Sequence, residues 1–104
     1  MKHIVILAAG LLATGVTGVV NAQDAAKLAV DKACLACHSI DKKVVGPSYK
    51  DVAAKYKGNA KAEAMLVQKV IKGGSGVWGQ IPMPPNASLK EDEAKLLVKW
   101  VLSQ

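Results

Sequence analysis

The chain has 104 residues and is basic, with 14 lysines, no arginine and eight acidic residues, giving a formal net charge of +6. The lysines are spread along the chain, which argues against a nucleic-acid interface. Such a surface suits either transient docking to acidic partners or solubility alone. The length accommodates one domain. A domain of this size has a limited core and often needs a covalent cross-link or a cofactor. Phenylalanine is absent, so another large apolar group is expected in this core.

The N-terminal segment, residues 1–22, has the features of a signal peptide. A basic start at Lys2 precedes an apolar or small run over residues 4–20, and Val20-Asn21-Ala22 has the pattern of a signal-peptidase site. An uncleaved transmembrane anchor is the alternative, but the run is shorter than the ~20 residues that a spanning helix prefers. We therefore expect cleavage after Ala22, a mature domain of residues 23–104 in the bacterial periplasm, and no stable membrane insertion.

Apolar spacing predicts an all-α domain of about four helices, because no segment shows the alternation of a β-strand. Gly46-Pro47 and Gly73-Gly74 interrupt the helical patterns. Ser88 and Glu91 have the spacing of a capping box, so we expect Ser88 to be the N-cap of the last helix. The predicted helices cover Asp24 to about Cys37, Ser48 to about Lys57, Ala60 to Lys72, and Ser88 to about Leu102.

The residues Cys34-Leu35-Ala36-Cys37-His38 have the spacing of a covalent haem c attachment site. Two thiols three positions apart can each add to a vinyl group of the porphyrin, and the adjacent imidazole can ligate the iron. A thioredoxin-type dithiol and half of a zinc site are the alternatives. No strand pattern precedes the motif, and residues 23–104 contain no other cysteine or histidine to complete a zinc site. The motif therefore predicts one haem c, the largest apolar group of the core.

Met65 and Met83 are the candidates for the second iron ligand within residues 23–104. Met65 falls in a helical pattern, where methionine is usually a core filler. Met83 has prolines on both sides, which exclude a helix and could hold a thioether in a defined place. We therefore assign Met83 as the ligand; a proline-rich surface turn with an incidental methionine is the alternative.

Ligation by His38 and Met83 predicts a one-electron carrier rather than an enzyme. Both axial positions are filled by protein, so neither O₂ nor a substrate finds a vacant site, and the thioether favours ferrous iron as the metal cycles between its ferrous and ferric states. A haem enzyme or gas sensor with an open iron position and a haem-free thiol oxidoreductase are the alternative classes.

The segments CLACH, VGPSYKDVAAKY, GVWGQIPMPPN and KWVLSQ, in this order, resemble the small class I cytochromes c of the cytochrome c-551, or c-8, type. The resemblance covers nearly all of residues 23–104. It implies a compact fold of about four helices around one haem, with the first and last helices packed together. It also implies a monomeric respiratory carrier that takes electrons from a quinol-oxidising membrane complex and passes them to a nitrite reductase, as in denitrification, or to a terminal oxidase.

Lys42, Lys43 and Lys50 follow the attachment motif and are candidate docking residues.

The resemblance implies roles for individual residues, none of them catalytic. Cys34 and Cys37 are similar to the thioether residues, His38 to the proximal iron ligand and Met83 to the distal one.

Four further residues resemble neighbours of the haem in this family. Pro47 would accept the Nδ1–H of the proximal imidazole through its carbonyl, Asn86 would donate near the distal sulfur, and Trp78 would donate to a haem propionate. Without the resemblance, these residues could simply start a helix, cap a turn and fill the core. Lys69 stands where a basic side chain, commonly arginine, approaches a propionate, but lysine lacks the guanidinium fork.

Overall fold

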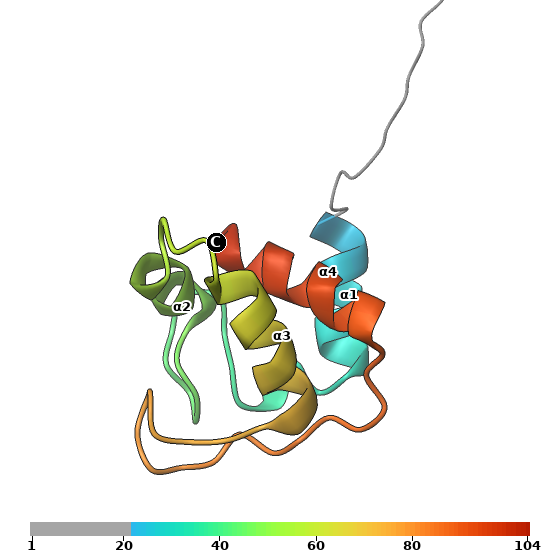
Figure 1. Ribbon diagram of the computed structural model, residues 1–104. Helices are drawn as coiled ribbons and strands as arrows, with labels where there is room; N and C mark the ends of the chain where they lie inside the picture. Colours follow the sequence, from blue (N-terminus) through green and yellow to red (C-terminus); the bar gives the residue numbers. More distant parts are fainter. Residues whose placement is uncertain (1–21) are drawn as a thin grey trace, which may run out of the picture.

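Four α-helices and one 3₁₀ turn make up the computed structural model over residues 22–104, the part of the chain that the structure describes. Apart from Ala22, the predicted signal peptide lies outside these residues. The all-α prediction is confirmed (Figure 1). The elements are α1 (Ala22–Asp31), η1 (Cys34–Ala36), α2 (Tyr49–Lys55), α3 (Ala62–Lys72) and α4 (Glu91–Leu102).

Helix α4 packs against all three other α-helices and supplies much of the core. Leu97 and Val98 of α4 are almost fully buried, and Ala94 is completely buried. Ala25 and Ala29 of α1 are also 0% exposed, so small side chains lie where α1 and α4 contact each other. Small side chains allow two helix axes to approach closely. The expected packing of the first helix on the last is present (Figure 1).

The first helix ends earlier than predicted and does not run into the attachment motif. Helix α1 stops at Asp31, and Ala33 adopts the left-handed conformation with φ 63° before the separate turn η1 begins at Cys34. A left-handed alanine costs on the order of 1 kcal/mol, so no local preference of this residue type marks the break. The sequence pattern extended the helix because it contains neither glycine nor proline at this point.

The predicted capping box of the last helix is wrong. Helix α4 starts at Glu91 with Lys90 as its N-cap, and the Lys90 backbone N–H donates to Glu93 Oε1 at 3.0 Å. The Ser88 hydroxyl instead donates to Asn86 Oδ1 at 3.0 Å. Because the Ser88 hydroxyl bonds to Asn86, it does not cap α4, and Leu89, only 6% exposed, packs into the core just before the helix.

Ser48 caps α2, and its removal should weaken the fold. Its hydroxyl accepts a hydrogen bond from the Asp51 backbone N–H at 3.1 Å, and the residue is 2% exposed. We expect Ser48→Ala to lower the free energy of unfolding by about 1 kcal/mol in chemical denaturation. Ser75→Ala is the control, because this exposed hydroxyl caps no helix and forms no hydrogen bond within residues 22–104, and its effect should stay within about 0.5 kcal/mol. Equal losses for the two variants would contradict the capping role.

Candidate functional site

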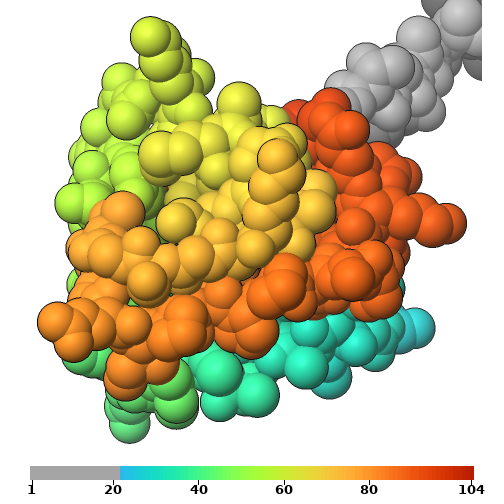
Figure 2. Space-filling view, turned by 60° about the horizontal axis from the view of Figure 1, so that its bottom comes forward, coloured from blue at the N-terminus to red at the C-terminus, as the bar shows by residue number. Residues whose placement is uncertain are grey.

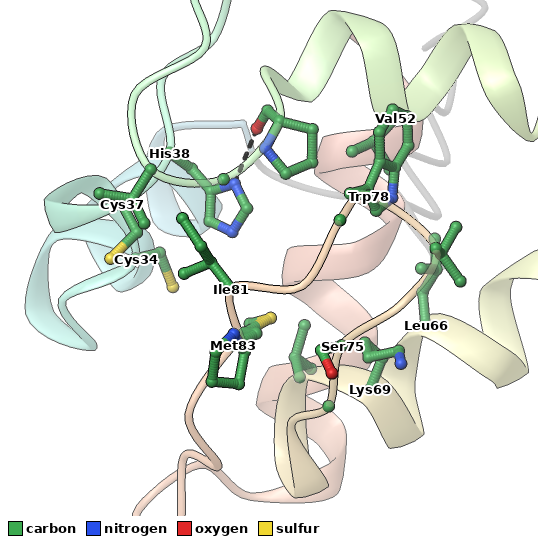
Figure 3. A pocket seen from close by; sticks show the side chains of 18 of the residues that line it. Cys34, Cys37, His38, Val52, Leu66, Lys69, Ser75, Trp78, Ile81 and Met83 are labelled. Atoms are coloured by element: carbon green, nitrogen blue, oxygen red, sulfur yellow. Dashed lines mark hydrogen bonds between the residues drawn. The ribbon is translucent and has the colours of Figure 1, made fainter.

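A cavity of about 730 Å³ lies between η1, α2, α3 and α4 and the two loops that flank α2 and α3. Most of its lining is apolar, including Val52, Leu66 and Ile81 (Figure 3). The 83 described residues therefore surround a space far larger than the ordinary packing defects of a domain. Four residues predicted to hold the cofactor all line this cavity: Cys34, Cys37, His38 and Met83.

The attachment residues are held by a backbone turn and a returning loop. The His38 N–H donates to the Cys34 carbonyl at 3.0 Å, which closes the turn. The Cys37 carbonyl accepts from the N–H groups of Val45 and Gly46 at 3.1 and 2.7 Å, so the following loop folds back against the motif. Both thiols are thereby presented at the cavity from one short segment (Figure 3).

The Cys34 thiol is partly buried at the cavity. Burial raises the pKa of this thiol, whereas a thioredoxin-type dithiol depends on a lowered one. Among residues 22–104 no group of three or more histidine, cysteine or acidic side chains could hold a metal ion, so the zinc alternative has no site there either.

The His38 imidazole is fixed in orientation and tautomer. Its Nδ1 lies 2.7 Å from the Pro47 carbonyl oxygen, so Nδ1 carries the proton and the lone pair of Nε2 is free for a metal. The ring stacks on Tyr49, with centroids 5.3 Å apart and planes at 26°, and Tyr49 is only 5% exposed. A Cβ at Gly46 would lie 2.5 Å from His38 Cε1, so this position needs glycine to accommodate the imidazole.

Met83 is attached to the end of α3 through its backbone. Gly74 and Met83 exchange two hydrogen bonds, N–H to carbonyl, of 2.9 and 2.8 Å, and the Asn86 N–H donates to the Ile71 carbonyl at 3.1 Å. We call residues 73–90, which connect α3 and α4, the distal loop. From the sequence, the rigidity of the distal loop was expected to come from its prolines alone. Gly73-Gly74, expected only to end a helix, is also the sequence signal for the backbone pairing of Gly74 with Met83.

Met65 does not belong to the core, contrary to the expectation for a helical methionine. It is 43% exposed and lines the cavity from α3, whose core side is formed by residues such as Ala62 and Val67. Two thioethers therefore face the same space. The difference between them is the backbone, because Met83 lies in a loop whose chain is paired with Gly74.

Trp78 and Lys69 line the cavity from the distal loop and from the last turn of α3. Trp78 is 42% exposed, and the Lys55 ammonium lies 5.5 Å from the centroid of its ring. A Cβ at Gly74 would lie 2.9 Å from Lys69 Nζ, so glycine leaves room for this amine. Within residues 22–104 neither side chain donates a hydrogen bond, and both donors are therefore available to an acidic group in the cavity.

Asn86 is the one predicted site residue that the structure places outside the cavity lining. Its Nδ2 donates to the Lys32 carbonyl at 3.1 Å, and its Oδ1 accepts from Ser88. The Lys32 ammonium donates in turn to the Ser88 carbonyl at 3.0 Å. Asn86 thereby ties the distal loop to the end of α1, and its bond near the Met83 sulfur stays a prediction.

These residues fit a covalently attached haem c. Two thiols and a free imidazole Nε2 come from one segment, a thioether comes from another, and apolar side chains surround the space between them. Gly46 keeps clear the position of the imidazole. The donor set matches the thioether and axial ligand chemistry of c-type haem.

Known proteins of similar sequence and structure agree with this donor set. The family model described as cytochrome c matches residues 22–104. Cytochrome c-551 of Pseudomonas aeruginosa is 57% identical over 96 residues, which cover 90% of this chain and 91% of that protein. The crystal structure of Nitrosomonas europaea cytochrome c552 matches with a TM-score of 0.73 and 50% identity, over 75% of this chain and 96% of that one. The class 1 cytochrome MtoD of Sideroxydans lithotrophicus matches with a TM-score of 0.69 and 37% identity, over 82% and 97% of the two chains.

Within residues 22–104, no helix combines the length and the apolar character that crossing a membrane requires. The attachment motif, the fold and the relatives all point to the same class of molecule. The chain belongs to the cytochrome c family, as a small electron carrier with one covalently attached haem c.

Proposed function

We propose that this protein is a periplasmic one-electron carrier whose haem iron is ligated by His38 and Met83. The observation that carries the proposal is that both side chains line one cavity from separately anchored segments. Cleavage after Ala22 and thioether bonds to Cys34 and Cys37 belong to the same proposal.

The protein's part in electron transfer is to hold the iron site in one arrangement. The bound haem c supplies the one-electron ferrous–ferric couple. The Pro47 carbonyl orients the imidazole of His38 and strengthens its donation. The Met83 thioether is neutral and soft, which favours the ferrous state and raises the reduction potential. Because His38 and Met83 would together complete the ligation of the iron, we infer that the protein carries electrons without binding a substrate at the metal.

Two further side chains would meet the polar edge of the cofactor. We propose that Trp78 and Lys69 donate to the haem propionates, because both line the cavity and neither donates to another described residue. Lysine at this place supplies one point charge rather than the paired donors of arginine.

Electron exchange would take place at the exposed rim of the cavity. Val44, Val77 and Ile81 are each more than half exposed there, and Lys43 lies in the same rim. An apolar rim with a basic neighbour suits brief, salt-sensitive contact with acidic redox proteins. We propose a quinol-oxidising membrane complex as donor and a nitrite reductase or terminal oxidase as acceptor, with the carrier acting as a monomer.

The native protein, purified from the periplasmic fraction, tests this function. Its intact mass should equal that of residues 23–104 plus one haem, and the reduced protein should not bind carbon monoxide at neutral pH. Rapid carbon monoxide binding would contradict closed ligation by His38 and Met83. An unmodified dithiol mass would contradict haem attachment and favour a thiol oxidoreductase.

A further inference from the structure

The tip of the distal loop, residues 75–82, has few ties to the rest of the protein. All of its residues are exposed, and Gly76 bonds only within the loop, to the Gly79 carbonyl at 2.8 Å. Within the described chain, no hydrogen bond or ion pair joins residues 77–82 to another element. The backbone pairing of Gly74 with Met83 fixes the base of the loop but leaves its tip free of such bonds.

Lys55, the last residue of α2, reaches this tip. Its Nζ lies 5.5 Å from the ring centroid of Trp78 and 5.9 Å from that of Tyr56. Both distances are within the range of cation–π attraction, which for tryptophan is the strongest. Lys55 forms no ion pair among residues 22–104, so the contacts of its ammonium in this region are the two rings.

Trp78 is the side chain through which the tip meets α2. Figure 3 shows it beside Val52 at the edge of the cavity, while Met83 lies farther along the same loop. In Figure 2, the orange segment around residue 80 forms a band on this face beside the yellow residues of α3. Holding the indole at α2 would therefore restrain the tip of the distal loop beside the cavity that Met83 also lines.

We propose that Lys55 is a positioning residue that clamps Trp78 between α2 and the distal loop and so favours the closed arrangement in which Met83 ligates the iron. This inference rests on the proposed function of Met83. An exogenous ligand can reach the iron only when Met83 leaves, so the affinity of the ferric protein for such a ligand reports how often the loop opens.

Imidazole binding to the ferric holoprotein tests the role of Lys55. We expect Lys55→Gln to tighten apparent imidazole binding about two- to fivefold, the size of an exposed cation–π contact. Lys55→Arg keeps a cation that can stack on the indole and should bind imidazole as the unmodified protein does. Lys57→Gln is the matched control, because it removes an exposed lysine just beyond α2 that faces neither ring, and it should also leave binding unchanged.

The pairing with Trp78 is tested by a double-mutant cycle. In a Trp78→Leu background, Lys55→Gln should no longer change imidazole affinity, because the partner ring is gone. An unchanged affinity in Lys55→Gln, or an effect that persists without Trp78, would overturn the inference. If the unmodified protein binds imidazole as tightly as Met83→Ala, the proposed ligation itself fails, which is a separate outcome.

Discussion

Replacing Met83 with alanine should open the haem iron to external ligands and lower its reduction potential. The thioether is the ligand that favours ferrous iron, and axial ligands set haem potentials over a range of ~0.8 V, so we expect a drop on the order of 100 mV. Carbon monoxide should bind the reduced variant, and ferric imidazole affinity should rise at least about a hundredfold. Redox titration and ligand titration of the purified holoprotein measure both effects.

Met65→Ala is the control for this prediction, since Met65 is the other thioether that lines the cavity. Its removal should leave the potential close to that of the unmodified protein and the iron closed. If Met65→Ala opened the iron and Met83→Ala did not, the ligand assignment would have to move from the distal loop to α3.

A methyl group at Gly73 should disrupt the distal loop from its base. Gly73 has φ 73°, and a Cβ there would overlap the Met83 carbonyl oxygen and lie 2.8 and 2.9 Å from backbone atoms of Pro85 and Pro84. None of these atoms can rotate away as a side chain would. We expect Gly73→Ala to lower the free energy of unfolding by about 2–4 kcal/mol and to weaken Met83 ligation. Denaturation and imidazole titration of the ferric holoprotein measure these losses.

Gly79→Ala separates the steric overlap from the backbone strain. Gly79 also has positive φ, 123°, but a Cβ there would meet nothing within 4 Å. This variant should cost only the strain of the backbone, about 1–2 kcal/mol, and should retain Met83 ligation. Equal loss of ligation in both variants would show that the contact of Gly73 with the Met83 carbonyl is unimportant.

The parts of the fold that short-range patterns encode could be predicted from the sequence. The all-α class, the presence of four helices and the packing of the first on the last are confirmed. The helix boundaries were less accurate because tertiary contacts decide them. Ala33 adopts the left-handed conformation although no glycine marks this position, and the Ser88 hydroxyl bonds to Asn86 instead of capping α4.

In the candidate site, too, short-range patterns could be predicted from the sequence, whereas contacts between distant residues could not. Cys34, Cys37 and His38 are neighbours in the chain, so their joint position at the cavity follows from their spacing. The pairing of Gly74 with Met83 joins residues that the sequence pattern does not relate. Lys55 gave no signal in the sequence, because a lone lysine at a helix end looks like any solvated charge until Trp78 is placed beside it.

The bond from Asn86 to the Lys32 carbonyl links the segment that contains Met83 to the segment that contains His38. The two proposed iron ligands therefore belong to one connected unit, as the donor atoms of a chelate do. The bond joins a residue two positions before Cys34 to one three positions after Met83, at 3.1 Å, in addition to the pairing of the loop with α3. With Met83 as the proposed ligand, a thioether that left the iron would stay at a high effective concentration beside it. Its return would then compete well against any dissolved ligand, and the same sulfur would serve through many redox cycles.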